Sequence, residues 1–115
     1  MTVASCTFER LDGNALQLSG YNRRAALLDN AFAWIGDTAM SAWGYTDEHD
    51  GTGGDQPRGS VIEGNLVREI GLYQKQSSFW GQAKACLSTI RHNLAFNLPR
   101  AAINFNDNLG GGNQV

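Results

Sequence analysis

The sequence predicts an all-β fold, a parallel β-helix of about four coils, from three observations. These are an internal repeat, insertions that spare the repeated positions, and asparagines that recur at one position of the repeat. The shift that aligns Val3 with Leu27 also aligns Phe8 with Phe32 and Leu11 with Ile35. This period of about 24 residues lies within the range of roughly 20 to 50 that is typical of proteins built from stacked units. Residues 1–115 are therefore expected to form a single solenoid segment.

The third and fourth copies keep this template after two insertions. The third copy places Ile62, Asn65, Val67 and Ile70 at the repeated positions, and the fourth places Ile90, Asn93, Ala95 and Leu98 there. An insertion of 11 residues precedes the third copy, in the Gly- and Asp-rich stretch 45–59, which predicts one long surface loop. An insertion of four residues is expected within 71–80. Both insertions fall between repeated apolar positions, as a stacked solenoid tolerates.

Each copy is expected to contribute one short strand to each of three parallel sheets. In the stretch SVIEGNLV (60–67), residues 61–63 form one strand, Gly64 and Asn65 form a sharp corner, and residues 66–67 begin the next strand. A corner of this kind favours Gly and Asn because both tolerate left-handed backbone dihedrals.

Asparagines recur at this corner in successive copies. Asn30, Asn65 and Asn93 share the position, and Cys6 occupies it in the first copy. Stacked strands lie about 4.8 Å apart, so the side-chain amides are expected to hydrogen-bond one to the next as a structural ladder.

The strand that begins at Ala15, Ala39, Ser78 and Ala102 in the four copies is expected to present a polar face. Alternation places Leu16, Leu18, Met40, Ala42, Phe79, Gly81, Ile103 and Phe105 inside the coil. One outward column is then Gln17, Ser41, Trp80 and Asn104, and the next is Ser19, Trp43, Gln82 and Asn106.

Two tryptophans among amides and hydroxyls suit a carbohydrate, because sugar rings stack on indoles while sugar hydroxyls need hydrogen-bonding partners. The sequence therefore predicts substrate-binding residues at Trp43, Trp80, Gln82, Asn104 and Asn106. The alternative is a solvated sheet surface whose two tryptophans are covered by the inserted loops.

Composition argues against several classes of partner. The net charge is −2, so there is no broad basic surface to attract a nucleic acid or an anionic membrane. No apolar run approaches the length of about 18 residues that spans a membrane. Cys6 and Cys86 are too few for a disulfide framework and lack metal-ligand spacing, so small buried hydrophobic roles are expected for them.

Several phrases of the chain resemble a known superfamily. The repeats, the asparagine corner and the stretches GLYQKQSSFW, STIRHNLAFNLPRAAINFND and GGGN are similar to right-handed parallel β-helix proteins of the pectate-lyase-like superfamily. This resemblance implies right-handed coils, a secreted or cell-surface location, and a polysaccharide groove along the polar strands, flanked by turn insertions. It implies less about chemistry, because the superfamily includes lyases, hydrolases, epimerases, phage adhesins and structural fibres.

Two catalytic chemistries fit such a groove. A lyase acting on an acidic polysaccharide needs a cation, or Ca²⁺, beside the substrate carboxylate and a base for the adjacent proton, and Lys75 and Arg100 lie in turns that lead into the polar strand. A hydrolase needs two carboxyl groups, and Asp37 precedes the polar strand while Asp107 follows it. None of the cationic groups carries a spacing signature, and such groups are more often solvated surface charges, which is the alternative.

Metal and cofactor signals are weak. Asp47, Asp50 and Asp55 populate the long loop and allow a Ca²⁺ site, but they match no calcium-loop motif, and His49 stands alone for zinc. No metal ligands and no cofactor are therefore predicted, with Ca²⁺ as the alternative.

A structural role is the alternative to a carbohydrate-active one. Neither end of the repeat array carries an amphipathic cap, and open strand edges invite pairing. Val115 follows Ile90 by about one repeat, where a fifth coil would open, so further coils or neighbouring subunits are expected at both ends. A non-catalytic extracellular filament would satisfy the same pattern.

Overall fold

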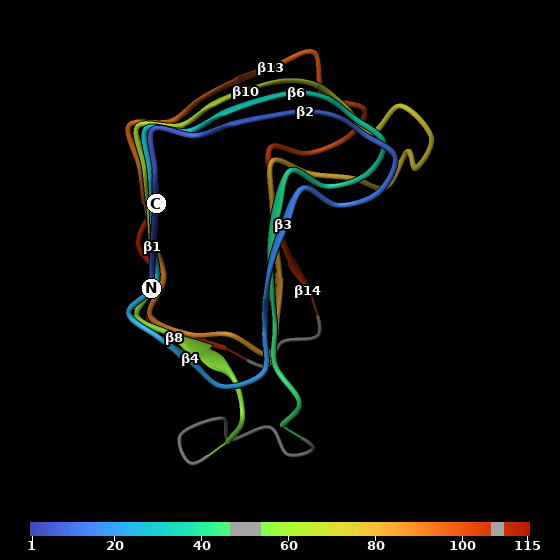
Figure 1. Cartoon of the computed structure of the whole chain (residues 1–115). Helices are drawn as coiled ribbons and strands as arrows, with labels where there is room; N and C mark the ends of the chain where they lie inside the picture. The colour runs from blue at the N-terminus through green and yellow to red at the C-terminus, as the bar shows by residue number, and fades with distance from the viewer. Residues whose placement is uncertain (47–53, 107–109) are drawn as a thin grey trace.

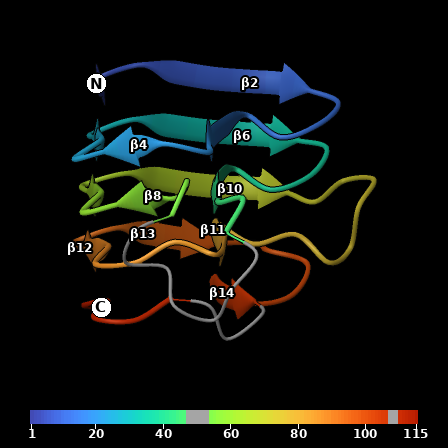
Figure 2. The same cartoon turned by 90° about the horizontal axis from the view of Figure 1, so that it is seen from below.

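The computed structural model describes residues 1–46, 54–106 and 110–115, and it confirms a parallel β-helix of about four coils. Followed from the N-terminus, the chain winds clockwise in Figure 1 through one sheet after another. Figure 2 shows the coils stacked in sequence order, with the first coil on the side that faces the viewer of Figure 1. The winding is therefore right-handed.

Three parallel sheets form the walls of the solenoid. The first sheet consists of β1 (Thr2–Ala4), β5 (Ala26–Leu28), β9 (Val61–Glu63) and β12 (Thr89–Arg91). The second sheet consists of β2 (Thr7–Leu11), β6 (Ala31–Ile35), β10 (Leu66–Ile70) and β13 (Leu94–Phe96). The third sheet consists of β3 (Leu16–Ser19), β7 (Met40–Trp43), β11 (Trp80–Ala83) and β14 (Ile103–Asn106). A short fourth sheet, absent from the sequence-based prediction, pairs β4 (Asn22–Arg23) with β8 (Pro57–Arg58).

The strand register confirms the sequence repeat. Val3, Leu27, Ile62 and Ile90 pair in succession across the first sheet. In the second sheet Phe8 pairs with Phe32, and their rings stack with centroids 4.9 Å apart. Leu27, Phe32 and Ile62 are buried in one hydrophobic core that runs along the axis. Apolar residues therefore recur with the period of one coil because each covers the corresponding residue of the next.

The corner between the first and second sheets corrects one detail of the prediction. The left-handed residue is the one before each asparagine: Gly64 has φ 69°, and Ser5, Asp29 and His92 occupy the same place with φ between 53° and 55°. Glycine adopts this conformation without a Cβ penalty. The asparagines are therefore explained by their side-chain hydrogen bonds rather than by their backbone.

The predicted ladder of asparagines is present at this corner. Asn65 Nδ2 donates to Asn93 Oδ1 at 2.9 Å, and Asn30 Nδ2 donates to Asn65 Oδ1 at 3.1 Å. The backbone N–H groups of Cys6, Asn30 and Asn65 also donate to the Oδ1 of the next asparagine, at 3.0, 3.0 and 2.9 Å. Asn30 and Asn65 are buried, so each amide satisfies groups that water does not reach. Cys6, at the end of the ladder, is exposed, so the buried role expected for it is wrong.

The insertion between β10 and β11 is one residue longer than predicted, and this reverses the two faces of β11. Ile70 pairs with Ile35, whereas Trp80, ten positions after Ile70, pairs with Met40, only five positions after Ile35, so the insertion has five residues. A change of register by one residue moves every side chain to the opposite face. Trp80 and Gln82 point into the coil and are 0% and 5% exposed, so the prediction that they face outward is wrong.

The other two register predictions are confirmed. Val61 pairs with Ala26 in the first sheet, as the predicted alignment of the third copy with the second requires, so the long insertion has its predicted length. The predicted bounds of its loop, 45–59, are too wide, because Pro57 and Arg58 form β8 and Pro57 is buried. Gln114 forms a parallel bridge with Thr89, which places Val115 opposite Ile90.

Candidate functional site

The outward face of the third sheet carries two columns of side chains. One column is Gln17, Ser41, Gly81 and Asn104, and the other is Ser19, Trp43, Ala83 and Asn106. The predicted positions of Trp43, Asn104 and Asn106 on this face are correct. Gly81 and Ala83 stand where Trp80 and Gln82 were expected, because of the additional inserted residue.

A hollow of ≈ 160 Å³ lies on this face, with Gly81 among its lining residues. Gly81 separates Ser41 from Asn104 in its column and has no side chain to fill the space between them. A Cβ added there would lie 3.7 Å from Thr38 Cγ2, an ordinary contact distance, so nothing in the packing requires a glycine. The missing side chain therefore shapes the hollow rather than the fold.

The lining of the hollow is rich in hydrogen-bonding groups and carries one indole. Asp37, Thr38, Ser41, Trp43, Asn104 and Asn106 are among the lining residues. The side chain of Trp43 is 44% exposed. The hydroxyl oxygens of Ser41 and Ser78, which also line the hollow, are buried and have no hydrogen-bond partner among the described residues. Buried hydroxyls are usually paired, so these two unpaired oxygens are exceptions beside the hollow.

Asp37 lines the hollow and also anchors the five-residue insertion. Its Oδ1 accepts hydrogen bonds from the Ser77 hydroxyl and from the backbone N–H of Thr38, both at 2.7 Å. Its carbonyl oxygen accepts from the N–H of Gly71 at 3.2 Å. Asp37 therefore positions the turn that borders the hollow, whether or not it also reacts with a substrate.

The two predicted cationic groups lie apart from the lining of the hollow. Lys75 Nζ donates to the carbonyl oxygens of Gly71 and Leu72, at 2.9 and 3.0 Å, so this ammonium group closes its own turn. Arg100 is exposed in the turn before β14 and is not among the lining residues. Asp107, the predicted partner of Asp37, lies outside the described residues. The described part of the hollow thus brings together one carboxylate, no cation, and several amides and hydroxyls.

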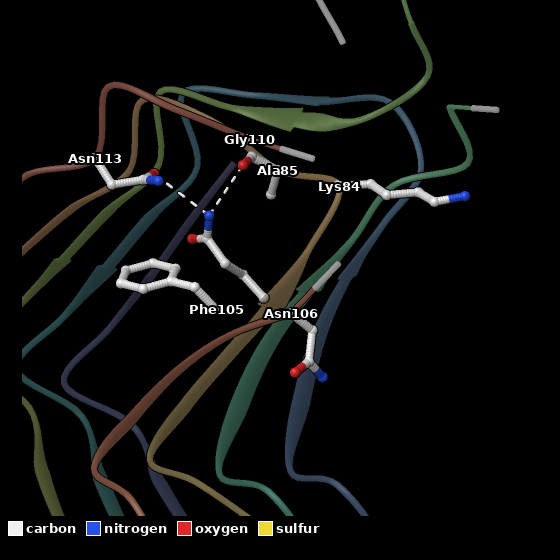
Figure 3. Close-up of a pocket in the computed structure, with 7 residues that line it drawn as sticks. Lys84, Ala85, Phe105, Asn106, Gly110 and Asn113 are labelled. Atoms are coloured by element: carbon white, nitrogen blue, oxygen red, sulfur yellow. Dashed lines mark hydrogen bonds between the residues drawn. The ribbon is translucent and has the colours of Figure 1, made fainter. Parts of the chain in front are cut away.

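Gln82 is among the residues that line the first hollow, and it also lines a second one, of ≈ 230 Å³, beside the turn after β11 (Figure 3). Its Nε2 donates to the carbonyl oxygen of Ala85 at 2.9 Å and to Asn113 Oδ1 at 3.4 Å. Asn113 Oδ1 in turn accepts from the N–H of Ser88 at 3.0 Å. This amide network joins the third coil to the C-terminal segment.

An exposed tryptophan that is not among the predicted site residues lies on the second sheet. Trp34 is 38% exposed, and the guanidinium carbons of Arg68 and Arg10 lie 4.6 and 5.7 Å from its ring centroid. The sequence feature that could have identified it is its place in the repeat, because Trp34 occupies the position that Arg10 holds in the first copy. Two cation–π contacts already occupy this indole, whereas Trp43 has no such contact among the described residues.

Metal-binding and membrane-spanning features were sought in residues 1–46, 54–106 and 110–115. No group of three or more His, Cys, Asp or Glu side chains gathers there to hold a metal ion. The loop residues Asp47, His49 and Asp50 lie outside these ranges. Within the same ranges, no helix is long and apolar enough to cross a bilayer.

Comparison with protein-family models, with curated proteins and with solved structures found no match to this chain.

Proposed function

We propose that this protein binds a polysaccharide on the outward face of its third sheet. The observation that carries the proposal is the hollow lined by Gly81, where an exposed indole, amides and hydroxyl-bearing side chains meet on a parallel sheet. An indole offers an apolar surface to a sugar ring, while amides and hydroxyls bind its hydroxyl groups. The likeness to the pectate-lyase-like superfamily supports the same ligand class and a secreted or cell-surface location.

The described lining favours binding over either predicted reaction. A uronate lyase needs a cation beside the substrate carboxylate, and Lys75 and Arg100 do not line the hollow. A glycosidase needs two carboxyl groups, and Asp37 is the one carboxylate among the described lining residues. We therefore propose a carbohydrate-binding solenoid segment, with sugar hydroxyls rather than sugar carboxylates as the groups recognised at this hollow.

The experiment is a calorimetric titration of the protein with neutral and uronate-containing oligosaccharides. We expect saturable binding, weakened about tenfold or more by Trp43→Ala, as for a central aromatic contact. Trp34→Ala is the matched control, because it removes an indole of similar exposure from another sheet. Absence of binding across the panel, or equal loss in both variants, would overturn the proposal. Release of unsaturated products or reducing ends would instead show that the site is catalytic.

A second candidate function rests on the apolar end of the stack. A hollow of ≈ 510 Å³ there is lined by residues that include Phe79, Ile90, Ala95, Ile103 and Val115. At the opposite end, Val3, Phe8 and Leu16 occupy the same positions of the repeat and are partly buried. Because the two surfaces share one register, we propose the first coil of another copy as the occupant, which would extend the solenoid into a filament. Its β1 would have to displace Gln114 and Val115, which lie beside Thr89 and Ile90.

Sedimentation velocity over a range of concentrations tests this second candidate. We expect association, which Ala95→Asp abolishes because it places a charge on the apolar end. Leu94→Asp is the control, since the side chain of this neighbouring residue points outward from the same strand and is 61% exposed. A monomer at every concentration would exclude the filament.

A further inference from the structure

Three arginines from two coils surround one hollow at the corner between the fourth and first sheets. Arg23, Arg24 and Arg58 line it together with Gly59 and Leu87, and its volume is ≈ 410 Å³. The chain has 9 Lys and Arg residues and a net charge of −2, so a third of its cations gather at this hollow. These three arginines are not among the functional residues that the sequence predicts.

The short fourth sheet explains why the arginines meet. Arg23 pairs in register with Arg58, so their side chains project from adjacent parallel strands. Pro57 is buried, so alternation turns Arg58 toward the outside. Gly59 follows Arg58 with φ 69°, and a Cβ added to it would lie 3.8 Å from Arg24 Cγ, an ordinary contact distance, so this glycine serves the backbone turn beside the third arginine. Like charges on directly opposed strands destabilise a sheet, so this pairing is unfavourable unless an anion compensates it.

The guanidinium of Arg23 is held in place by neutral groups. Its Nη1 donates to the carbonyl oxygens of Asn22, at 3.1 Å, and of Gln56, and its Nη2 donates to that of Gly54 at 3.4 Å. The Tyr21 ring centroid lies 3.9 Å from its Cζ. These neutral contacts fix the position of the guanidinium, and no carboxylate among the described residues pairs with it. A guanidinium has five N–H donors, so some remain for a ligand.

No described carboxylate neutralises the cluster. The ion pairs among the described residues both involve Glu63, which belongs to the first sheet. Asp55, the nearest described acid in the sequence, contacts Tyr45 through its backbone carbonyl. The guanidinium groups of Arg24 and Arg58 form no hydrogen bond or ion pair with described residues. Three arginines that line one hollow, without a described acid paired to them, match the chemistry that recognises a multi-oxygen anion.

We propose that this hollow binds a tetrahedral oxyanion, a sulfate or phosphate group, bridged by Arg23, Arg24 and Arg58. The site is separate from the hollow on the third sheet and does not depend on the proposed polysaccharide binding there. The anion has two possible sources, a free inorganic ion or a sulfate ester on a glycan, and both present the same oxygens to the guanidiniums.

Calorimetry with sodium sulfate and sodium phosphate, against chloride at equal ionic strength, tests the site. We expect saturable binding that Arg24→Gln and Arg58→Gln each weaken about tenfold or more, because each removes a charge-assisted hydrogen-bond donor. Arg10→Gln is the matched control, since Arg10 and Arg24 are both exposed and both have left-handed backbones, with φ 56° and 51°. The control should bind like the unmodified protein.

Two further measurements test whether the variants remain folded and identify the source of the anion. Thermal unfolding in chloride should be the same for Arg24→Gln and Arg10→Gln, and sulfate should raise the unfolding temperature only where the site is intact. A sulfated oligosaccharide compared with its desulfated form identifies the source of the anion. No saturable binding of sulfate, phosphate or the sulfated oligosaccharide, or an equal loss in Arg10→Gln, would overturn the proposal.

Discussion

Trp80 donates its indole N–H to Oε1 of Gln82 at 3.0 Å inside the third coil, although both residues were predicted to face a ligand. Trp80 takes the inward position that Met40 holds one coil earlier, and Gln82 takes that of Ala42. A tryptophan in an apolar interior needs an acceptor for its N–H, and a glutamine needs donors and acceptors of its own. The hydrogen bond between the two side chains therefore explains why both residues can be buried inside the coil.

Gln82→Ala should destabilise the protein by about 2–4 kcal/mol, because it leaves the Trp80 N–H buried without an acceptor and opens a cavity. Chemical denaturation measures the free energy of unfolding. Gln17→Ala is the control, since the same side chain lies exposed on the outer face of the same sheet, and it should change stability by less than about 0.5 kcal/mol. Equal effects would place Gln82 at the surface.

Asn65→Ala should cost about 3 kcal/mol or more, because neighbours on both sides lose buried partners. Asn65 Oδ1 accepts from Asn30, and its Nδ2 donates to Leu27 O at 2.9 Å as well as to Asn93. The comparison is Asn97→Ala, which removes an exposed hydrogen bond to Glu69 and should cost far less. A similar loss in the two variants would contradict the ladder as a source of stability.

The pKa of Glu63 should lie below its usual range, mainly because Arg91 Nη2 donates to its carboxylate at 3.0 Å, with a smaller contribution from His92. A carboxyl whose pKa is lowered by folding stabilises the protein above its unfolded-state pKa, and that contribution is lost as pH falls through the folded-state value. NMR titration of the carboxyl carbon should show a higher midpoint in Arg91→Ala, and a smaller rise in His92→Gln. An unchanged midpoint in Arg91→Ala would exclude the ion pair in solution.

Gly81→Ala should keep or slightly raise stability while weakening polysaccharide binding. A glycine in a strand costs roughly 0.5–1 kcal/mol relative to alanine, and the new Cβ meets Thr38 at an ordinary distance. The methyl group would nevertheless occupy the hollow. Gly13→Ala is the control, because a Cβ there meets nothing within 4 Å and lies outside the lining residues. Unchanged affinity in Gly81→Ala would mean that the sugar does not enter this hollow.

The sequence was sufficient for the repeat, the sheets and the ladder, because stacking imposes the same residue type at the same position of every coil. It failed at β11 because Phe79 and Trp80 are adjacent aromatics, and both are buried. Either could fill the place of Met40 by size, and only the hydrogen-bonded register decides between them. A register that places Trp80 outside also places Gly81 inside, and it therefore does not predict the hollow that the missing side chain of Gly81 creates.

The arginine hollow was missed for a different reason. Arg23 and Arg58 are separated by the spacing of the second and third copies, so their alignment was present in the sequence. The two-residue strands that bring them together carry no apolar alternation, which is the signal on which strand prediction depends.

The most direct test of the proposed function is an NMR titration. It follows the three indole N–H signals while an oligosaccharide that binds in the calorimetric titration is added. The exposed Trp43 lines the hollow, Trp34 lies on another sheet under two arginines, and Trp80 is buried against Gln82. We expect the Trp43 signal to shift with saturation while those of Trp34 and Trp80 stay in place. A shift confined to Trp34, or saturating binding that moves none of the three signals, would contradict a polysaccharide site on the third sheet.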